Sequence, residues 1–468
     1  MNGHVAVIDL GKTNSKVALV DTRAATELEV ITTPAATSED GLYPHLDDRI
    51  IEEFVINSLR ELARLEDINA VTVTTHGATA ALIDSGGQLA LPVLDYEFDG
   101  PDALADEYEA IRPPYSETGS PRLPNGLNIG AQLFWQASTQ PAAFARTDCI
   151  LTWPQYWIHR LSGIRCNDVS SLGAHTDLYA PHQRRFSTLI ERMHWTSLMP
   201  PNVPSGQALG TLTAEFCRRT GLEPGTAVHT GIHDSNASLV PHLLSGQTCF
   251  SVVSTGTWII CMNIGGENVA LSEKRDCLYN VNAYGDPVAS SRFMGGRERQ
   301  LIIDQEVHRF ESNPGTQAAA YGALLRTEID DTAMIMPTAV QKTGPYPDAE
   351  FTWLKSARTT DPAQRYCCIS LYLALMSAEC LSLIGAQGPI HVEGPLAHDA
   401  VFTRMLRAVC GRPVLVSTSM TGTSVGAAML IARPDHMPAG HDVVIDDVEQ
   451  RWLRDYAQRW QAAVYATR

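Results

Sequence analysis

The sequence predicts an α/β protein made of two related domains. The chain has 468 residues, more than one hydrophobic core usually supports, so we expect two large domains. An apolar strand, a turn rich in Gly and Thr, and a second apolar strand occur at residues 5–21 and again at 248–263. This internal repeat indicates related halves, with a boundary near residues 240–248. Strand, glycine turn, helix, strand and helix alternate over residues 390–430, which is typical of α/β folds.

Composition and charge restrict the function classes. Hydrophobic residues make up 44% of the chain and charged residues 19%, which is typical of a globular protein and excludes a largely disordered one. The formal net charge is −17, and Lys and Arg do not cluster. This charge argues against a nucleic acid or a membrane as partner, whereas a small anion in a local basic pocket stays compatible with it.

Three further features concern the cellular location. The apolar runs are shorter than a membrane span requires, and the N-terminus enters a strand without a basic region or cleavage site. The ten cysteines are scattered, without C-x-x-C pairs or the spacing of zinc ligands. We therefore expect reduced core thiols and a cytoplasmic location.

The first hairpin carries polar groups suited to phosphate. Residues 5–10 and 16–21 are apolar strands, and the tight turn between them can direct N–H groups and hydroxyls at an anion. Asp9, at the edge of the first strand, can hold Mg²⁺ through water, because Mg²⁺ needs few protein carboxylates when phosphates are present. A plain hairpin with polar turn residues is the alternative. The candidate phosphate-binding residues are Lys12, Thr13, Asn14 and Ser15.

The next elements lead to a second candidate site. Residues 47–66 predict an amphipathic helix, and residues 70–74 predict a strand that leads into His76 and Gly77. A His beside a Gly at a strand end suits contact with a polar ligand, although a single His is more often structural.

An acidic loop follows, in which Asp95 is a candidate sugar contact and a solvated turn is the alternative. Residues 101–124 are rich in Pro and predict an irregular surface segment, and residues 129–140 and 154–161 predict helices. Asp168, in a later polar loop, is a further candidate for a sugar contact.

A carboxylate lies at a strand-to-helix turn in the middle of the chain. Residues 226–229 predict a strand, and a helix is expected from about residue 237. Asp234 lies between them, where a bound hydroxyl could meet it as general base, and His233 is a candidate substrate contact beside it. A helix N-cap is the alternative, since Asp is favoured there.

The second half repeats the phosphate-binding pattern. Its hairpin turn contains Thr255, Gly256 and Thr257. Residues 280–360 yield no assignment. A later strand ends at Gly394 and Pro395, where a flat nucleoside could lie against the backbone. The remaining predicted elements are helices at 366–384, 400–409 and 423–430 and strands at 390–393 and 413–417.

Five of these segments resemble the motifs of FGGY carbohydrate kinases, in the family's order and over almost the whole chain. They are residues 9–16 (first phosphate motif), 75–77 (early substrate motif), 231–234 (catalytic aspartate), 254–257 (second phosphate motif), and Gly394 with Gly426 (adenosine motif). The chain departs from the family at Lys12, where many members have a small hydroxyl residue, and at Pro395, which lacks an N–H.

The resemblance implies two actin-like (ribonuclease-H-like) domains, residues 1–243 and 244–468, with a catalytic cleft between them. The first would bind the sugar and carry the first phosphate loop, and the second would bind ATP. The implied cofactors are ATP and Mg²⁺. Asp234 would take a proton from a hydroxyl of a ketose or deoxyketose, such as L-fuculose, L-rhamnulose or a ketopentose. The implied sugar contacts are His76, Gly77, Asp95, Asp168 and His233.

Other functions fit the same scaffold. A polyol or autoinducer kinase of the same family, a catalytically silent sugar or nucleotide sensor, and an actin- or chaperone-type ATPase are the alternatives. The intact Asp9, Asp234 and Thr-Gly-Thr turn at 255–257 favour an enzyme. Sugar specificity depends on a pocket assembled from distant loops, so the acceptor stays open at this point, as does a homodimer.

Overall fold

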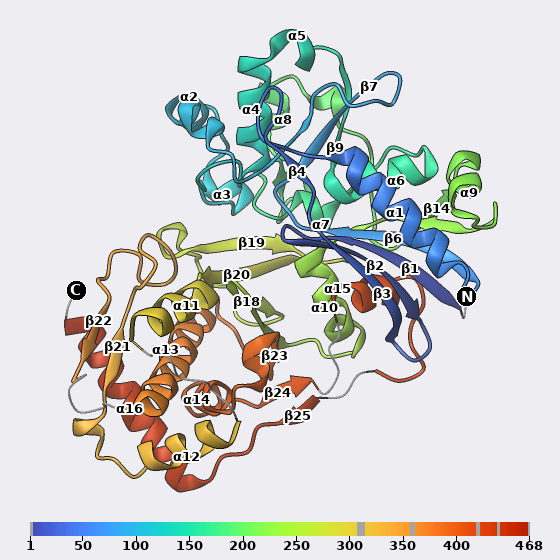
Figure 1. Ribbon diagram of the computed structural model, residues 1–468. Coiled ribbons are helices and arrows are strands. Elements are labelled where there is room, and N and C mark those ends of the chain that lie inside the picture. Colours follow the sequence, from blue (N-terminus) through green and yellow to red (C-terminus); the bar gives the residue numbers. More distant parts are fainter. Residues whose placement is uncertain (1–2, 307–313, 356–360, 418–421, 438–439, 467–468) are drawn as a thin grey trace. The chain divides into compact units, whose positions relative to one another are not determined.

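The computed structural model describes residues 3–306, 314–355, 361–417, 422–437 and 440–466, which form two compact units (Figure 1). Unit 1 contains the described residues of 1–247, 279–288 and 421–438, and unit 2 contains those of 248–278, 289–420 and 439–468. Two short segments from the second half of the chain therefore belong to unit 1. The assignment of sugar and ATP to separate domains, and the cleft between them, stay predictions.

A seven-stranded sheet organises unit 1. Its strands are β1 (His4–Leu10), β2 (Asn14–Asp21), β3 (Thr26–Pro34), β6 (Ile68–Thr75), β14 (Ala208–Thr211), β15 (Ala227–His229) and β16 (Ile232–His233). They lie in the order β14-β15-β6-β1-β2-β3, and β16 also pairs with β6. β1, β15 and β16 each run parallel to β6, whereas β2 runs antiparallel to both β1 and β3.

Alternate residues of β1 pack into two different cores. Ala6 and Ile8 pack with α1, α6 and α9, whereas Val5 and Val7 pack with α10 and α15. Burial on both faces explains the continuous apolar run of this strand. Asp9 follows Val7 in the alternation, so it lies on the α10/α15 face. The helices are α1 (Asp48–Leu62), α6 (Trp153–Ser162), α9 (Ala214–Thr220), α10 (Asp234–Leu244) and α15 (Thr423–Met429).

The rest of unit 1 consists of short elements around a further core that contains residues of β7, β9 and α4. Residues 101–124, which we expected to be irregular, include three short helices, η1, α2 and α3. The elements are β4 (Thr37–Ser38), β5 (His45–Leu46), β7 (Ala80–Asp84), β8 (Val93–Leu94), η1 (Gly100–Leu104), α2 (Ala105–Glu109), α3 (Tyr115–Thr118), α4 (Ile129–Thr139), α5 (Pro141–Phe144), β9 (Thr147–Thr152), β10 (Asn167–Asp168), α7 (Val169–Leu172), β11 (Tyr179–Ala180), β12 (Arg185–Phe186), α8 (Thr188–Arg192), η2 (Thr196–Leu198) and β13 (Asn202–Val203).

The second large sheet has the order β19-β20-β18-β17-β23-β24-β25. Its strands are β17 (Phe250–Thr255), β18 (Ile259–Ile264), β19 (Cys277–Val281), β20 (Pro287–Phe293), β23 (Ile390–Glu393), β24 (Val414–Ser417) and β25 (Gly440–Asp442). The other elements of this half are η3 (Glu273–Arg275), α11 (Gly295–Glu306), α12 (Pro314–Leu324), η4 (Ile329–Asp331), β21 (Met334–Met336), β22 (Thr352–Leu354), α13 (Pro362–Leu383), η6 (Pro395–His398), α14 (Ala400–Cys410) and α16 (Asp447–Ala466).

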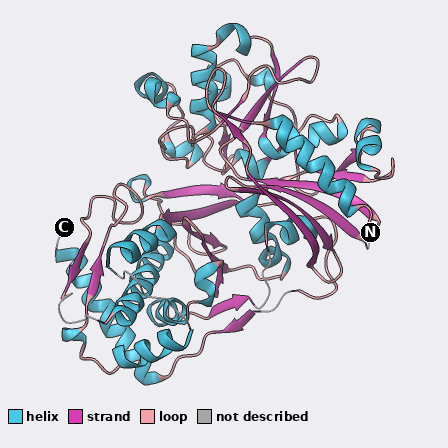
Figure 2. Cartoon of the chain, in the orientation of Figure 1, coloured by secondary structure: helices cyan, strands magenta, loops and turns pink. Residues whose placement is uncertain are grey.

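The two large sheets, whose strands are magenta in Figure 2, share a local topology of strand pairing. In the first, β1 pairs antiparallel with β2 and parallel with β6, and β2 pairs antiparallel with β3. In the second, β17 pairs antiparallel with β18 and parallel with β23, and β18 pairs antiparallel with β20. The internal repeat predicted from the two hairpins is therefore present in the strand order.

Helix α13 lies in the core of unit 2. It is 22 residues long, and its length and composition would suffice for a membrane span. The sequence analysis, which expected only shorter apolar runs, did not predict this helix as a candidate span. However, 78% of its most apolar 18-residue window is buried inside the protein, where it packs against α11, α12 and α14. Burial on all sides explains a helix that is apolar around its whole circumference.

Trp460 on α16 provides a test of this packing. Its side chain is 1% exposed, and Nε1–H donates to the Ile335 carbonyl at 2.7 Å. We expect Trp460→Ala to lower the free energy of unfolding by about 3–5 kcal/mol, because it removes a large buried ring and leaves a cavity. Tyr465 on the same helix is 56% exposed, so Tyr465→Ala is the control, with an expected change within about 0.5 kcal/mol. Equal effects of both variants in chemical denaturation would contradict the packing.

Candidate active site

Three parallel strands of unit 1 end side by side and bring the candidate residues together. Asp9 on β1 is opposite Thr74 on β6, and His233 on β16 is opposite Thr75. His76 follows β6 directly. The carboxyl ends of parallel strands are where open α/β sheets bind ligands, so this edge is the natural place for a site.

Asp234 is the first residue of α10, and its two carboxylate oxygens differ. Oδ1 accepts a hydrogen bond from Ser235 N–H at 2.6 Å and lies 3.2 Å from His233 Nε2. Oδ2 has no hydrogen-bond partner among the described residues, and the side chain is 29% exposed. The helix therefore engages one oxygen and leaves the other free to accept a proton. The N-cap position itself belongs to His233.

His233 is buried against a glycine. A Cβ atom on residue 77 would lie 2.7 Å from His233 Nε2, so only Gly at this position admits the imidazole ring. Packing of the His233 ring therefore explains why residue 77 is a glycine. Its contact with a sugar stays a prediction. Burial lowers the pKa of His233, and the nearby charge of Asp234 acts in the opposite direction.

Asp9 is a buried carboxylate with two partners on one oxygen. Lys16 Nζ lies 3.3 Å from Oδ2, and the Thr423 hydroxyl donates to the same atom. Burial raises the pKa of Asp9 from 3.8 to about 6, although Lys16 and Thr423 lower it. The charge of Asp234 also raises this pKa, so the two carboxylates interact electrostatically.

The donor set at Asp9 suits Mg²⁺ bound largely by water and phosphate. Within the described residues, no group of three or more His, Cys, Asp and Glu is arranged to hold a metal. Mg²⁺ keeps several waters and takes one or two carboxylates beside substrate phosphates. Oδ1 of Asp9 accepts no hydrogen bond from the described part of the chain, which makes it the donor available for such an ion.

Lys12 reaches the acidic loop. Its ammonium group contacts the Asp95 carboxylate, lies 3.3 Å from Glu97 Oε2, and lies 4.9 Å from the centre of the Tyr96 ring. Tyr96 in turn packs edge to face with the His76 ring, at 5.4 Å between centroids. Lys12 thus lies among the predicted sugar contacts, and its binding of phosphate stays a prediction.

His76 and the turn residues differ in their accessibility. His76 Nδ1 lies 2.9 Å from the Gly77 carbonyl oxygen, and burial lowers the pKa of this imidazole. Thr13 and Asn14 are exposed at the tip of the first hairpin, where a ligand can reach them. Ser15 is buried beside Leu10, so its side chain is the less accessible of the three.

Asp168 is completely buried and serves as the N-cap of α7. Its Oδ1 accepts from the N–H groups of Ser170 and Ser171 at 3.0 and 3.2 Å, and the hydroxyls of Ser170 and Ser205 also donate to its carboxylate. Ser170 Oγ accepts from the His233 N–H at 3.1 Å. A buried carboxylate with these partners has no direct access to a sugar, so its geometry fits the positioning of Ser170 and His233 instead.

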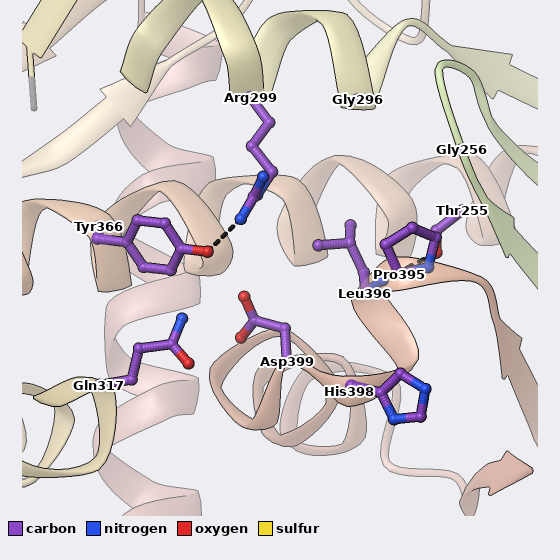
Figure 3. A pocket seen from close by; sticks show the side chains of 10 residues that line it. All are labelled: Thr255, Gly256, Gly296, Arg299, Gln317, Tyr366, Pro395, Leu396, His398 and Asp399. Atoms are coloured by element: carbon purple, nitrogen blue, oxygen red, sulfur yellow. Dashed lines mark hydrogen bonds between the residues drawn. The ribbon is translucent and has the colours of Figure 1, made fainter. Parts of the chain in front are cut away.

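Unit 2 contains a cavity of about 300 Å³ at the second phosphate turn (Figure 3). Thr255, at the end of β17, connects the second phosphate turn to the segment at residues 393–396. Its hydroxyl donates to the Glu393 carbonyl and accepts from the Leu396 N–H at 3.1 Å. Gly256 and Thr257 follow on the exposed part of this turn. The residues that line the cavity are Thr255, Gly256, Gly296, Arg299, Gln317, Tyr366, Pro395, Leu396, His398 and Asp399.

The turn at Gly394 and Pro395 has a local explanation. Gly394 has φ of +79°, and a Cβ atom there would lie 2.0 Å from the Thr255 carbonyl oxygen. Pro395 is the first residue of η6, where the missing N–H would have no partner within the helix in any case. Pro395, which departs from the family pattern, therefore has little effect on the stability of the fold.

Arg299 and Tyr366 are cavity residues that the sequence analysis missed. Figure 3 shows their side chains reaching toward one another from α11 and α13, and Arg299 donates a hydrogen bond to the Tyr366 hydroxyl. No carboxylate pairs with Arg299 in the described part of the chain. The sequence feature that could have indicated Arg299 is the Gly295-Gly296 pair at a helix start, with this Arg one turn later. It lies inside residues 280–360, which yielded no assignment.

Comparison with known proteins identifies the family. The N-terminal domain of the FGGY family of carbohydrate kinases matches residues 4–241, and the C-terminal domain of carbohydrate kinase FGGY matches residues 247–439. The repeated sheets, with carboxylates at the ends of parallel strands, define a protein of the actin-like sugar kinase class. The chain belongs to the FGGY family of carbohydrate kinases.

Individual relatives agree with this family. L-fuculokinase of Salmonella typhi is 28% identical over 271 residues, which cover 56% of this chain and 57% of that protein. L-fuculokinase of Escherichia coli K12 is 27% identical over 276 residues, covering 55% of this chain and 56% of that protein. The chain thus spans about half the length of the curated relatives it matches.

Solved structures extend over almost the whole chain. A carbohydrate kinase from Novosphingobium aromaticivorans is 37% identical, with a TM-score of 0.91 and 99% of both chains covered. A xylulose kinase from Rhodospirillum rubrum shares the fold at 19% identity, with a TM-score of 0.81, covering 99% of this chain and 98% of the other. The predicted family and the α/β fold with two actin-like domains are confirmed.

The raised pKa of Asp9 predicts how its replacement changes stability. A carboxyl with a pKa of about 6 in the folded chain and 3.8 when unfolded binds its proton more tightly when folded, so stability falls as pH rises through this range. Asp9→Asn stays neutral and should be more stable than the parent at pH 8, by about 1–3 kcal/mol, with the gain vanishing near pH 4. Urea denaturation at both pH values measures the difference.

The control for this prediction is Asp348→Asn, because Asp348 is fully exposed and its pKa is lowered by Lys342. This variant should show no gain at pH 8. A stability difference for Asp9→Asn that is the same at pH 4 and pH 8 would contradict the desolvation of Asp9.

Proposed function

We propose that this chain transfers the γ-phosphoryl group of ATP to a hydroxyl of a small ketose or deoxyketose. Phosphoryl transfer requires mainly positioning and neutralisation of charge, together with a group that accepts the proton of the attacking hydroxyl. The observation that carries the proposal is the state of Asp234. One oxygen is held and the other is free, at the strand edge where ligands of α/β sheets bind.

Asp234 Oδ2 is the proton acceptor in this mechanism. A sugar hydroxyl within hydrogen-bond reach of this oxygen would lose its proton to Asp234 as the oxygen attacks phosphorus. Asp9 would hold Mg²⁺ through water at Oδ1, and the ion would neutralise phosphate charge. Lys16, 3.3 Å from the other oxygen of Asp9, keeps this carboxylate paired, and Thr423 fixes its orientation.

The cavity of unit 2 would bind the nucleotide. The exposed turn at Gly256 and Thr257 suits phosphate oxygens, with the Thr257 N–H and hydroxyl as the donors, since the Gly256 N–H already donates to the Trp258 carbonyl at 2.9 Å. The turn at Gly394 and Pro395 offers backbone against which a flat base can lie, and Arg299 adds a planar cation that is not paired with a carboxylate in the described part of the chain. A guanidinium group suits both stacking on a base and hydrogen bonds to phosphate.

The sugar would bind beside Lys12, His76 and Asp95. Charged and neutral hydrogen-bonding groups in a partly buried setting suit a polyhydroxy ligand, because each hydroxyl both donates and accepts. The relatives named L-fuculokinase favour a deoxyketose as the first acceptor to test. Ketopentoses follow, since structures of xylulose kinases share the fold.

Asp234→Asn tests the proposed base. We expect kcat to fall by about 10²–10⁴-fold, because Asn keeps the shape of the side chain but cannot take a proton. Nucleotide affinity, measured by calorimetry, should stay within about 2-fold of the parent, since Asp234 is assigned to the sugar side. The assay follows ADP release with a panel of deoxyketoses, ketopentoses and polyols.

The same panel separates the alternatives. Equal ADP release with and without sugar would favour an ATPase, and sugar or nucleotide binding without turnover would favour a sensor. Near-normal turnover by Asp234→Asn would remove this residue from the role of base. A polyol as the best acceptor would move the substrate to another branch of the family.

Arg299→Ala tests the nucleotide cavity. We expect the KM for ATP to rise about 10-fold or more with little change in the KM for sugar, because a charge-assisted contact to the nucleotide is lost. Arg297→Ala is the matched control, since Arg297 lies on the same helix with its side chain exposed and outside the cavity lining. If both variants changed the KM for ATP equally, Arg299 would have no specific role.

A further inference from the structure

A chain of polar groups runs from the Ser170 carbonyl to the carboxylate of Asp234. Asn236 Nδ2 lies 3.4 Å from the Ser170 carbonyl oxygen and 3.1 Å from His233 Nδ1. The opposite ring nitrogen, Nε2 of His233, lies 3.2 Å from Asp234 Oδ1. Each group in this chain contacts the next, so the acceptor at the Ser170 end determines which ring nitrogen of His233 donates to Asp234.

The direction of the donors follows from the first link. A carbonyl oxygen can only accept, so the Asn236 atom that faces Ser170 must be the amide nitrogen. The same nitrogen therefore donates to His233 Nδ1, which must be the unprotonated ring nitrogen. The proton of a neutral imidazole is then on Nε2, the atom that faces Asp234.

Several contacts hold His233 in place. Its backbone N–H donates to Ser170 Oγ at 3.1 Å, and the Ser170 hydroxyl in turn donates to the buried Asp168. Gly77 leaves the space that the ring occupies. The tautomer and the backbone of His233 are thus fixed by Asn236, Ser170 and Asp168, which are all buried.

We propose that His233 is a positioning residue for Asp234, with its Nε2–H directed at Oδ1 by Asn236. The inference rests on the proposed function, because it gives Asp234 the role of base. Ser235 N–H and His233 Nε2 both engage Oδ1, so Oδ2 is the oxygen that is presented to the sugar hydroxyl. His233 acts through Asp234 and not by contact with the sugar, which revises its predicted role.

Other histidines of the chain provide an internal reference. In His45, His76, His175 and His229 the atom Nδ1 faces a carbonyl oxygen, at 2.8–3.0 Å, so a neutral ring there carries its proton on Nδ1. His233 has the opposite arrangement. His229 is equally buried on the preceding strand and has no described contact with Asp234, which makes it the matched control.

The first test is NMR of the protein with ¹⁵N-labelled histidine at pH 7, which distinguishes the two tautomers without any substrate. We expect His233 as the Nε2–H form and His229 as the Nδ1–H form. Asn236→Asp should convert His233 to a ring protonated on Nδ1, because a carboxylate can only accept. An Nδ1–H tautomer or an imidazolium at position 233 of the parent protein would overturn the proposal.

The second test is kinetic. Asn236→Asp and His233→Ala should each lower kcat by about 10–100-fold, the size expected when a reacting group is misplaced, with the KM for sugar changed less than about 3-fold. His233→Gln, whose amide can donate to Oδ1, should recover part of the loss. His229→Ala should keep kcat, and thermal unfolding of all variants shows that the fold is retained.

The outcomes separate this inference from the proposed function. A rise in the KM for sugar without a fall in kcat would make His233 a sugar contact and overturn the positioning role. Unchanged kinetics in Asn236→Asp with the expected tautomer switch would also overturn it, while Asp234 could still be the base. If the parent protein transfers phosphate to no sugar, the proposed function fails, and the tautomer measured by NMR alone decides whether Asn236 directs Nε2–H at Asp234.

Discussion

The proposed chemistry depends on a carboxylate that is held at one oxygen and free at the other. A carboxylate at the start of a helix is normally drawn to the N–H groups of that helix, because their unpaired donors favour negative charge. In Asp234 the Ser235 N–H and the His233 ring both meet Oδ1, which leaves Oδ2 without a partner in the described structure. The helix start therefore fixes the side chain without using up its capacity to accept a proton.

This arrangement requires the particular backbone that surrounds it. The parallel pairing of β6 with β1 and with β16 places Asp9, His76 and His233 at one edge of the sheet. Burial of Asp9 raises its pKa to about 6, and burial of Asp168 does the same for that residue. Lys16 and the Thr423 hydroxyl offset part of this cost at Asp9, and serine donors do so at Asp168. Unit 1 thus buries two carboxylates beside these strand ends, Asp9 on β1 and Asp168, whose partner Ser170 contacts His233.

The sequence predicted the strongly patterned parts of this structure. The hairpins around Gly11 and Gly256, the helix α1 and the strand-to-helix turn at Asp234 follow from apolar periodicity and turn residues, which are local signals. Residues 280–360 gave no prediction, because their helices have little amphipathic pattern and their packing depends on α13. The site was predicted by residue type, but the partners of each side chain were not. Lys12 pairs with Asp95, and Ser205 donates to Asp168, through contacts between segments 37–83 residues apart, which no local pattern records.

The most direct test of the account is chemical rescue of a variant that lacks the carboxylate. Asp234→Gly removes the proton acceptor and leaves space at Oδ2, so added small carboxylates should restore sugar-dependent ADP release. The account predicts that acetate restores more activity than the weaker base formate, whereas chloride at equal ionic strength restores none, because the rate of a base-assisted step rises with base strength. Equal rates with acetate, formate and chloride would contradict the assignment of Asp234 as the base.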